Sequence, residues 1–328
     1  MRGPTVSTVE TIDATMKHGL RIVVTGSGAI CGSGRTPDEV FTALLDGRSS
    51  IGPIRGWDAS TWATRTAAEI ADLDSRSLVR DRKLLKLIRR SDALGIYAAS
   101  QALDSSALPT WRDSLDPGSA ANVSDRVGLY VGSGGGTYDN QYDYFPLLSE
   151  AGGDMPKFGA ELDATVNPMW LLRSLPNNVL CHVGINYGLK GANACITNHS
   201  ISGMLAIVEA LSALRAGEAD YAVAVGHDAP IEPQYLLYYQ GVGLTARDAI
   251  RPFDAARDGS LFGEGAGALV METDSAAVAR GADVLGEVLG GGSASEAEGL
   301  LAIRDDGDGV IAAIEAALVD ADIDAGQV

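Results

Sequence analysis

Ser200 stands at a position where a serine hydroxyl could act as a nucleophile. The apolar segment 194–197 predicts a strand, and apolar spacing from Ile201 to Arg215 predicts a helix, so Ser200 lies in the turn between them. Backbone N–H groups at a helix N-terminus favour developing negative charge, which is the logic of a nucleophile elbow. The literal G-x-S-x-G pattern is absent, because positions 198 and 202 are Asn198 and Ser202. A helix-capping serine is the alternative interpretation.

A serine nucleophile requires a base, and His199 is the one histidine to which we assign a possible role of this kind. His199 directly precedes Ser200 and is the candidate auxiliary residue, although adjacent side chains in a turn are expected to point apart. His182 lies in an apolar segment and is expected in the core or an interface. His227 ends a predicted strand, where a hydrogen bond to a loop is expected.

A basic run is prominent in a chain that is otherwise acidic. Residues 79–103 are predicted as one long helix, and the first half of this helix carries Arg80, Arg82, Lys83, Lys86, Arg89 and Arg90. One interpretation is an ordinary solvated helix face. The functional interpretation is a docking patch for an acidic partner.

The elements that must position these residues alternate along the chain. Short apolar strands are predicted at 22–24, 127–131, 194–197, 221–225 and 268–271, with helical patterns between several of them. This alternation predicts a layered α/β fold with helices covering the sheet faces. Position 31 is Cys31, where a dinucleotide fingerprint would need glycine, and no Gly-Lys-Ser/Thr follows the glycines at 132–136. No cofactor site is therefore predicted.

Composition excludes several classes of protein. The 25 basic and 43 acidic residues among 328 give a net charge of −18, which disfavours nucleic-acid binding. No apolar run reaches the roughly 18 residues that span a bilayer, and the first twenty residues lack a signal peptide's apolar middle. Three cysteines without a CxxC pair predict neither a disulfide framework nor a metal site, and Cys195 is expected to be a buried thiol. A cytoplasmic protein is the default expectation.

Five segments, in this order, together resemble the elongating β-ketoacyl-acyl-carrier-protein synthases of the thiolase-like superfamily. They are Arg21–Gly28, Arg126–Gly134, Leu175-Pro-Asn177 with Gly188-Leu-Lys-Gly191, Arg251-Pro-Phe-Asp-Ala-Ala-Arg-Asp-Gly259, and Gly263-Glu-Gly-Ala-Gly267. The resemblance runs from about residue 21 to the end of the sequence.

The resemblance implies a thiolase-like α-β-α-β-α layered fold built from two similar halves. Residues 1–20 are then a flexible N-terminal arm, 21–272 the N-terminal half with the nucleophile, and 273–328 the start of an incomplete C-terminal half. It also implies Claisen condensation on acyl-carrier-protein thioesters. The protein is expected to form a homodimer, or a heterodimer with a ketosynthase-like subunit.

The sequence departs from this family pattern in two ways. Counting nine residues from Gly191 reaches Ser200, and Ser200-Ile-Ser-Gly203 fits the family's Cys-x-Ser-Gly, so serine replaces the nucleophilic cysteine. Neither family histidine motif, His-Gly-Thr-Gly-Thr nor the later Gly-His, occurs in the sequence. We therefore expect the polypeptide to continue beyond Val328, or the fold to be completed by another chain.

Three functions follow as hypotheses. In the first, Ser200 takes an acyl group from an acyl-carrier protein, which docks on Arg82, Lys83, Lys86, Arg89 and Arg90. In the second, the chain is a non-condensing partner of an active ketosynthase, comparable to a chain-length factor. In the third, it decarboxylates malonyl groups.

Overall fold

The computed structural model describes residues 20–134, 141–247, 249–299 and 303–328. The predicted arm at 1–20 lies, apart from its last residue, outside the described residues. No helix among the described residues is long and apolar enough to cross a membrane.

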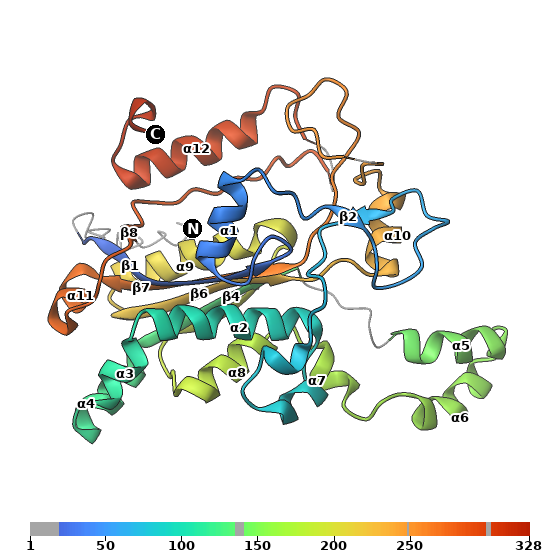
Figure 1. The fold of residues 1–328 in the computed structure, drawn as a ribbon, viewed down its shortest axis with the longest axis horizontal. Coiled ribbons are helices and arrows are strands. Elements are labelled where there is room, and N and C mark those ends of the chain that lie inside the picture. Colours follow the sequence, from blue (N-terminus) through green and yellow to red (C-terminus); the bar gives the residue numbers. More distant parts are fainter. Residues whose placement is uncertain (1–19, 135–140, 248, 300–302) are drawn as a thin grey trace, which may run out of the picture.

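A six-stranded mixed sheet forms the centre of the molecule (Figure 1). Its order is β5 (Asn193–Thr197), β4 (Val127–Ser133), β6 (Tyr221–Asp228), β7 (Gly265–Thr273), β1 (Ile22–Cys31) and β8 (Gly286–Glu287). Strand β4 runs parallel to β5 and β6, whereas β7 runs antiparallel to its neighbours β6 and β1. The carboxyl ends of β4, β5 and β6 therefore meet at one edge of the sheet.

Helices α2 (Arg90–Ser105) and α8 (Asn178–Tyr187) cover one face of the sheet. Close packing here depends on two glycines of β1, because a Cβ at Gly26 or Gly28 would collide with backbone carbonyls of α2. The Gly26-x-Gly28 pair thus allows helix α2 to pack closely against strand β1.

Helix α9 (Ser202–Arg215) covers the opposite face and buries alanine and leucine side chains against the sheet. Helix α12 (Asp308–Ala321) lies beyond α9 in Figure 1. An ion pair of 2.9 Å between Arg215 and Asp320 joins these two helices. The order of layers is thus helix, sheet, helix, and then the segment that carries α12.

Shorter elements complete the chain. The helices are α1 (Pro37–Leu45), α3 (Leu108–Asp113), α4 (Pro117–Asp125), α5 (Gln141–Ala151), α6 (Met155–Thr165), α7 (Trp170–Ser174), α10 (Pro233–Gly241) and α11 (Asp274–Arg280). The strands β2 (Gly52–Pro53) and β3 (Thr66–Ala67) form a small second sheet. In the described part of the chain, 3-10 segments lie at η1 (Ser75–Ser77), η2 (Arg82–Lys86), η3 (His199–Ile201) and η4 (Ala325–Gln327).

The long helix predicted over 79–103 is wrong. The chain forms η2, leaves helical geometry, and starts α2 only at Arg90. Asp92 explains the break, because its carboxylate accepts the Arg89 backbone N–H at 2.9 Å and so fixes the start of α2. Asp81 caps η2 in a similar way, through the N–H of Lys83.

Candidate active site

Ser200 lies in an elbow between β5 and α9, as predicted. The chain leaves β5 at Thr197, forms η3, and continues directly into α9. Ser200 is exposed and lines a cavity of about 420 Å³ at the carboxyl ends of β4 and β6. It lies inside η3, and no side-chain hydrogen bond caps either η3 or α9. The alternative of a capping serine therefore has no support from the geometry.

Ser202 holds the shape of this elbow. Its Oγ accepts the backbone N–H of Asn198 at 2.6 Å and donates to the His199 carbonyl at 2.8 Å. The Ser202 side chain is buried, and a Cβ at Gly132 of β4 would collide with the Ser202 carbonyl. The backbone on both sides of Ser200 is thus fixed by one hydroxyl and one close approach of main chains.

His199 is placed in an unusual backbone conformation. Its φ is +46°, in the left-handed region that L-residues rarely adopt. The side chain is exposed and lines the same cavity as Ser200. The structure therefore brings together the candidate nucleophile and the candidate auxiliary residue.

The other two histidines lie in different settings. His227 is buried on the α2 side of β6, and burial lowers its pKa to about 4. Within the described part of the chain, neither of its ring nitrogens has a hydrogen-bond partner, so the predicted loop hydrogen bond is not found. His182 is partly buried on α8, and burial lowers its pKa as well.

Cys195 is a poor substitute for the nucleophile. The thiol lies within β5, is partly buried, and donates to the Pro176 carbonyl at 3.4 Å. Burial raises the pKa of Cys195, with smaller contributions of the same sign from Cys181 and Asp92, so the thiolate is disfavoured.

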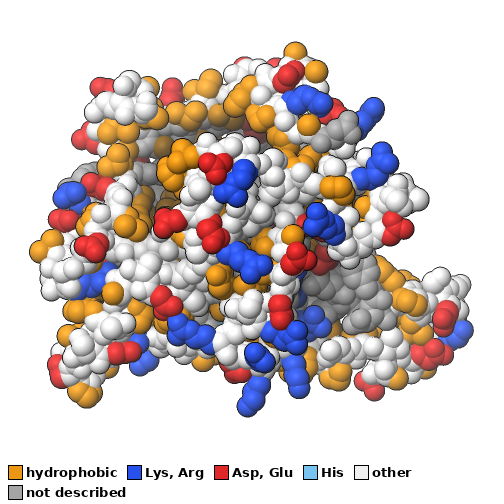
Figure 2. Space-filling model, in the orientation of Figure 1, with side chains coloured by type: hydrophobic (Ala, Val, Ile, Leu, Met, Phe, Trp, Pro, Cys, Tyr) orange, Lys and Arg blue, Asp and Glu red, His pale blue; other side chains and the backbone are white. Residues whose placement is uncertain are grey.

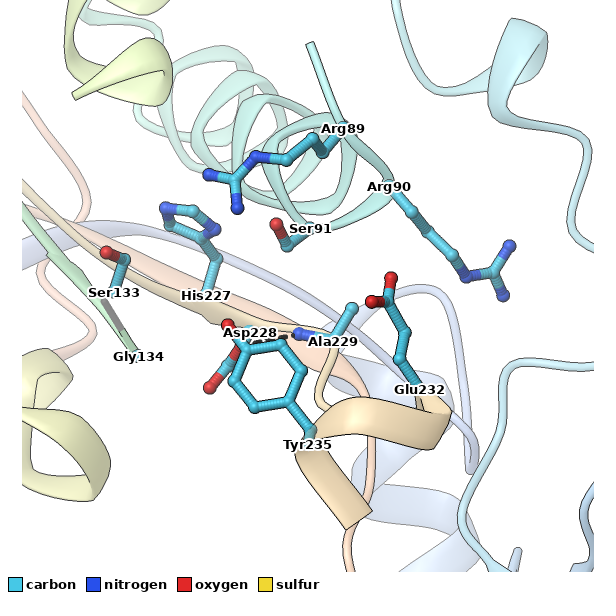
Figure 3. Close-up of a pocket in the computed structure, with 10 residues that line it drawn as sticks. All are labelled: Arg89, Arg90, Ser91, Ser133, Gly134, His227, Asp228, Ala229, Glu232 and Tyr235. Atoms are coloured by element: carbon cyan, nitrogen blue, oxygen red, sulfur yellow. Dashed lines mark hydrogen bonds between the residues drawn. The ribbon is translucent and has the colours of Figure 1, made fainter. Parts of the chain in front are cut away.

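A small polar pocket adjoins the Ser200 cavity at the end of β6. Ser133, His227 and Arg89 line this pocket (Figure 3). Its volume is about 20 Å³, which is room for about one water. Ser133 and His227 also line the Ser200 cavity. Ser133 Oγ and Arg89 Nε have no partner among the described residues, so this pocket is polar and incompletely satisfied.

Asp228 is a further residue of this site, and it is not among the candidates predicted from the sequence. It is the last residue of β6 and lines the cavity together with His199 and Ser200. Its position directly after His227, at the end of a predicted strand, was a usable signal. Because parallel strands end at the same edge of a sheet, a polar residue there lies near the turn that follows β5.

The basic run does not form one exposed patch. Arg82, Lys83 and Lys86 of η2 are exposed, whereas Arg89 is buried and its guanidinium pairs with Asp92 at 3.2 Å. Figure 2 shows Lys and Arg side chains that project from the lower edge of the molecule. The cyan segment before α2 lies at the same place in Figure 1.

Arg90 is also committed to an interaction within the fold. It pairs with the buried carboxylate of Glu264 at 2.6 Å and donates to the Ile70 carbonyl at 3.1 Å. The docking role of Arg89 and Arg90 stays a prediction, and the structure shows that each guanidinium already pairs with a carboxylate of the same chain.

No group of histidine, cysteine and acidic residues that could hold a metal ion is present among the residues that the structure describes.

Comparison with known proteins identifies the family. The model of the β-ketoacyl synthase N-terminal domain matches residues 20–277. The chain belongs to the β-ketoacyl synthase family. It is 32% identical to 3-oxoacyl-[acyl-carrier-protein] synthase 2 of Synechocystis sp., over 92% of this chain and 69% of that protein. It is also 32% identical to nodulation protein E of Rhizobium meliloti, over 84% of this chain and 64% of that protein.

A solved structure supports the same assignment. The structure described as the ishigamide ketosynthase/chain length factor superposes with a TM-score of 0.77 at 26% identity, over 94% of this chain and 72% of that one. The predicted thiolase-like α/β ketosynthase fold is thereby confirmed.

Proposed function

We propose that this β-ketoacyl synthase family member is an acyltransferase of fatty-acid or polyketide biosynthesis, and that Ser200 takes the acyl group from an acyl-carrier-protein thioester. The observation that carries the proposal is the exposed Ser200 at the start of a helical segment, inside a cavity at the strand ends. Family membership and the names of its relatives support the substrate class.

The chemistry is transfer from sulfur to oxygen. Ser200 Oγ attacks the thioester carbonyl, the carbon–sulfur bond breaks, and the carrier leaves as a thiol after gaining the serine proton. Backbone N–H groups at the start of η3 and α9 can stabilise the oxyanion, and each such donor contributes on the order of 3 kcal/mol. The product is an oxygen ester on Ser200.

The carrier partner would dock on the exposed part of the basic segment. Arg82, Lys83 and Lys86 offer local positive charge on a chain with net charge −18. An acidic carrier would otherwise be repelled, so this local contact is the expected source of fast association.

The test is the intact mass of the 328-residue chain after incubation with acyl-carrier thioesters. The wild-type chain should gain the mass of one acyl group, and Ser200→Ala should gain none. Ser212→Ala is the matched control, because Ser212 is an exposed serine on the same helix α9. Acylation of Ser200→Ala would show that the nucleophile lies elsewhere.

A second function is a chain-length-factor-like partner of an active ketosynthase. The likeness to the structure described as a ketosynthase/chain length factor and the serine at position 200 favour it. In that case the wild-type chain gains no acyl mass but forms a complex with a ketosynthase and changes the length of its product.

The family assignment also supports the proposed division of the chain. The family model ends at residue 277, close to the boundary that we place between the N-terminal half at 21–272 and the segment 273–328. A cytoplasmic location remains part of this proposal.

A further inference from the structure

Asp228 is directed toward the Ser200 side of the sheet by the alternation of β6. Gly226 packs closely against Gly203 of α9, and His227 points to the opposite face, against Gly95 of α2. Asp228 therefore returns to the α9 face, where it lines the cavity together with Ser200.

The Asp228 carboxylate is held in one orientation. Its Oδ1 accepts the backbone N–H of Ala229 at 2.8 Å. Its Oδ2 lies against the backbone of Gly134, where a Cβ would overlap this oxygen. The missing side chain at position 134 thus makes room for a carboxylate at the wall of the cavity.

Interactions of the backbone, and not of the imidazole ring, fix the position of His199. Its left-handed conformation has an energetic cost, and Ser202 fixes its carbonyl from the buried side. A bulky L-residue kept in this conformation beside a nucleophile is the kind of strain that clusters at functional sites. Its imidazole lines the same cavity as the Asp228 carboxylate and the Ser200 hydroxyl.

We propose that Asp228 is a positioning residue that orients the imidazole of His199 as the base for Ser200. This inference rests on the proposed acylation of Ser200. His199 takes the proton of Ser200 Oγ as the oxygen attacks the thioester carbonyl, and Asp228 stabilises the resulting imidazolium. The same proton then passes to the sulfur of the departing carrier thiol, so His199 ends neutral and the ester is the only new bond.

The charges around Asp228 are compatible with this role. Burial raises the pKa of Asp228, whereas the Ala229 N–H, Arg89 and His199 lower it. Arg89 is itself paired with Asp92, and His227, which also lines the cavity, lies on the other face of β6. Arg89 is therefore committed to Asp92, whereas the imidazole of His199 lines the cavity on the same side of the sheet as the Asp228 carboxylate.

The first measurement is the rate of acylation of the full chain by an acyl-carrier thioester. Asp228→Asn keeps the shape of the side chain and should lower this rate by at least about tenfold. Asp283→Asn is the control, because Asp283 is exposed between α11 and β8. The double variant Asp228→Asn/His199→Gln should be no slower than His199→Gln alone, since residues that act as one unit are not additive.

The second measurement does not depend on acylation. In an NMR titration of the histidine rings, Asp228→Asn should move the protonation midpoint of His199 to lower pH, and Asp283→Asn should not. Thermal unfolding of each variant verifies the fold.

The outcomes separate the two proposals. An unchanged His199 midpoint together with an unchanged acylation rate in Asp228→Asn overturns the positioning role, even when Ser200→Ala abolishes acylation. A wild-type chain that gains no acyl mass overturns the proposed function, whereas the titration still decides whether Asp228 faces His199.

Discussion

At the scale of single residues, the oxygen of Ser200 decides which chemistry is available. A thiol at this position would be partly ionised near neutral pH and would need little help from a base. A hydroxyl must be deprotonated as it attacks, so the neighbours of Ser200 matter more than they would for a cysteine. In the proposed mechanism, His199 supplies this base and Asp228 orients it.

Replacement of Ser200 by cysteine should therefore speed acyl uptake. At pH 7 we expect Ser200→Cys to be acylated at least about tenfold faster than the serine form, because the thiolate is available without a strong base. The two rates are measured by intact mass on reactions with the same acyl-carrier thioester that are quenched at successive times. Equal rates would mean that a step before attack, such as carrier docking, limits both forms.

The hydroxyl of Ser202 should make a measurable contribution to the free energy of unfolding. Ser202→Ala leaves the Asn198 N–H and the His199 carbonyl without their partner, at a cost of about 1–3 kcal/mol in the free energy of unfolding. Urea unfolding measures this cost, with exposed Ser212→Ala as the reference near zero. A loss of stability below about 0.5 kcal/mol would contradict the role of Ser202 in holding the shape of the elbow.

His227 makes a testable contribution to the pH dependence of stability. Its pKa of about 4 in the fold lies below the ordinary value of 6.5, so the unfolded chain binds more protons between these values. Stability should therefore fall as pH drops from about 6.5 to 4, by up to about 3 kcal/mol from this residue. Unfolding of wild type and His227→Gln across this range should show a shallower slope in the variant, and equal slopes would refute the assignment.

At the scale of elements, the 3-10 segment η2 takes the place of the predicted basic helix. Three exposed cations remain on or beside it for an acidic partner, while Arg89 and Arg90 tie the start of α2 to Asp92 and Glu264. Internal pairing thus falls on Arg89 and Arg90, and the proposed docking would fall on the exposed residues of η2.

Charge reversal on η2 should weaken carrier binding. Lys83→Glu/Lys86→Glu should lower the association rate with an acyl-carrier protein at least about threefold and reduce its salt dependence. Lys157→Glu on α6 is an exposed control. An unchanged rate in the double variant would leave η2 as an ordinary solvated surface.

The elements around Ser200 were predictable because their signals are local. The strand before it and the apolar spacing after it gave β5 and α9 within one or two residues. The break before α2 was not predictable by the same means, because it depends on the Asp92 carboxylate that accepts the Arg89 N–H and on an ion pair between residues 90 and 264. The place of Asp228 likewise depends on how β6 aligns with the turn after β5, and a strand pattern alone does not reveal this.

At the scale of the whole molecule, β5 is the edge strand of the sheet. It pairs with β4 on one side, and no described strand pairs with its other side. Partly exposed residues of this strand, such as Cys195 and Ile196, are available for association with a second sheet.

We therefore expect a symmetric or pseudo-symmetric dimer in solution. Light scattering at micromolar concentration should give twice the mass of 34.0 kDa for the isolated chain, or the mass of a complex when a ketosynthase-like subunit is present. A stable monomer under both conditions would contradict this expectation.

The glycine at position 132 has a consequence for how this protein can vary. The start of α9 rests directly on the backbone of β4, so no core side chain acts as a spacer between the sheet and the elbow. The contact between Gly132 and the Ser202 carbonyl leaves no space for a side chain at position 132. A single methyl group at position 132 would displace the elbow, so tolerance to mutation should change abruptly between Gly132 and its neighbours along the strand.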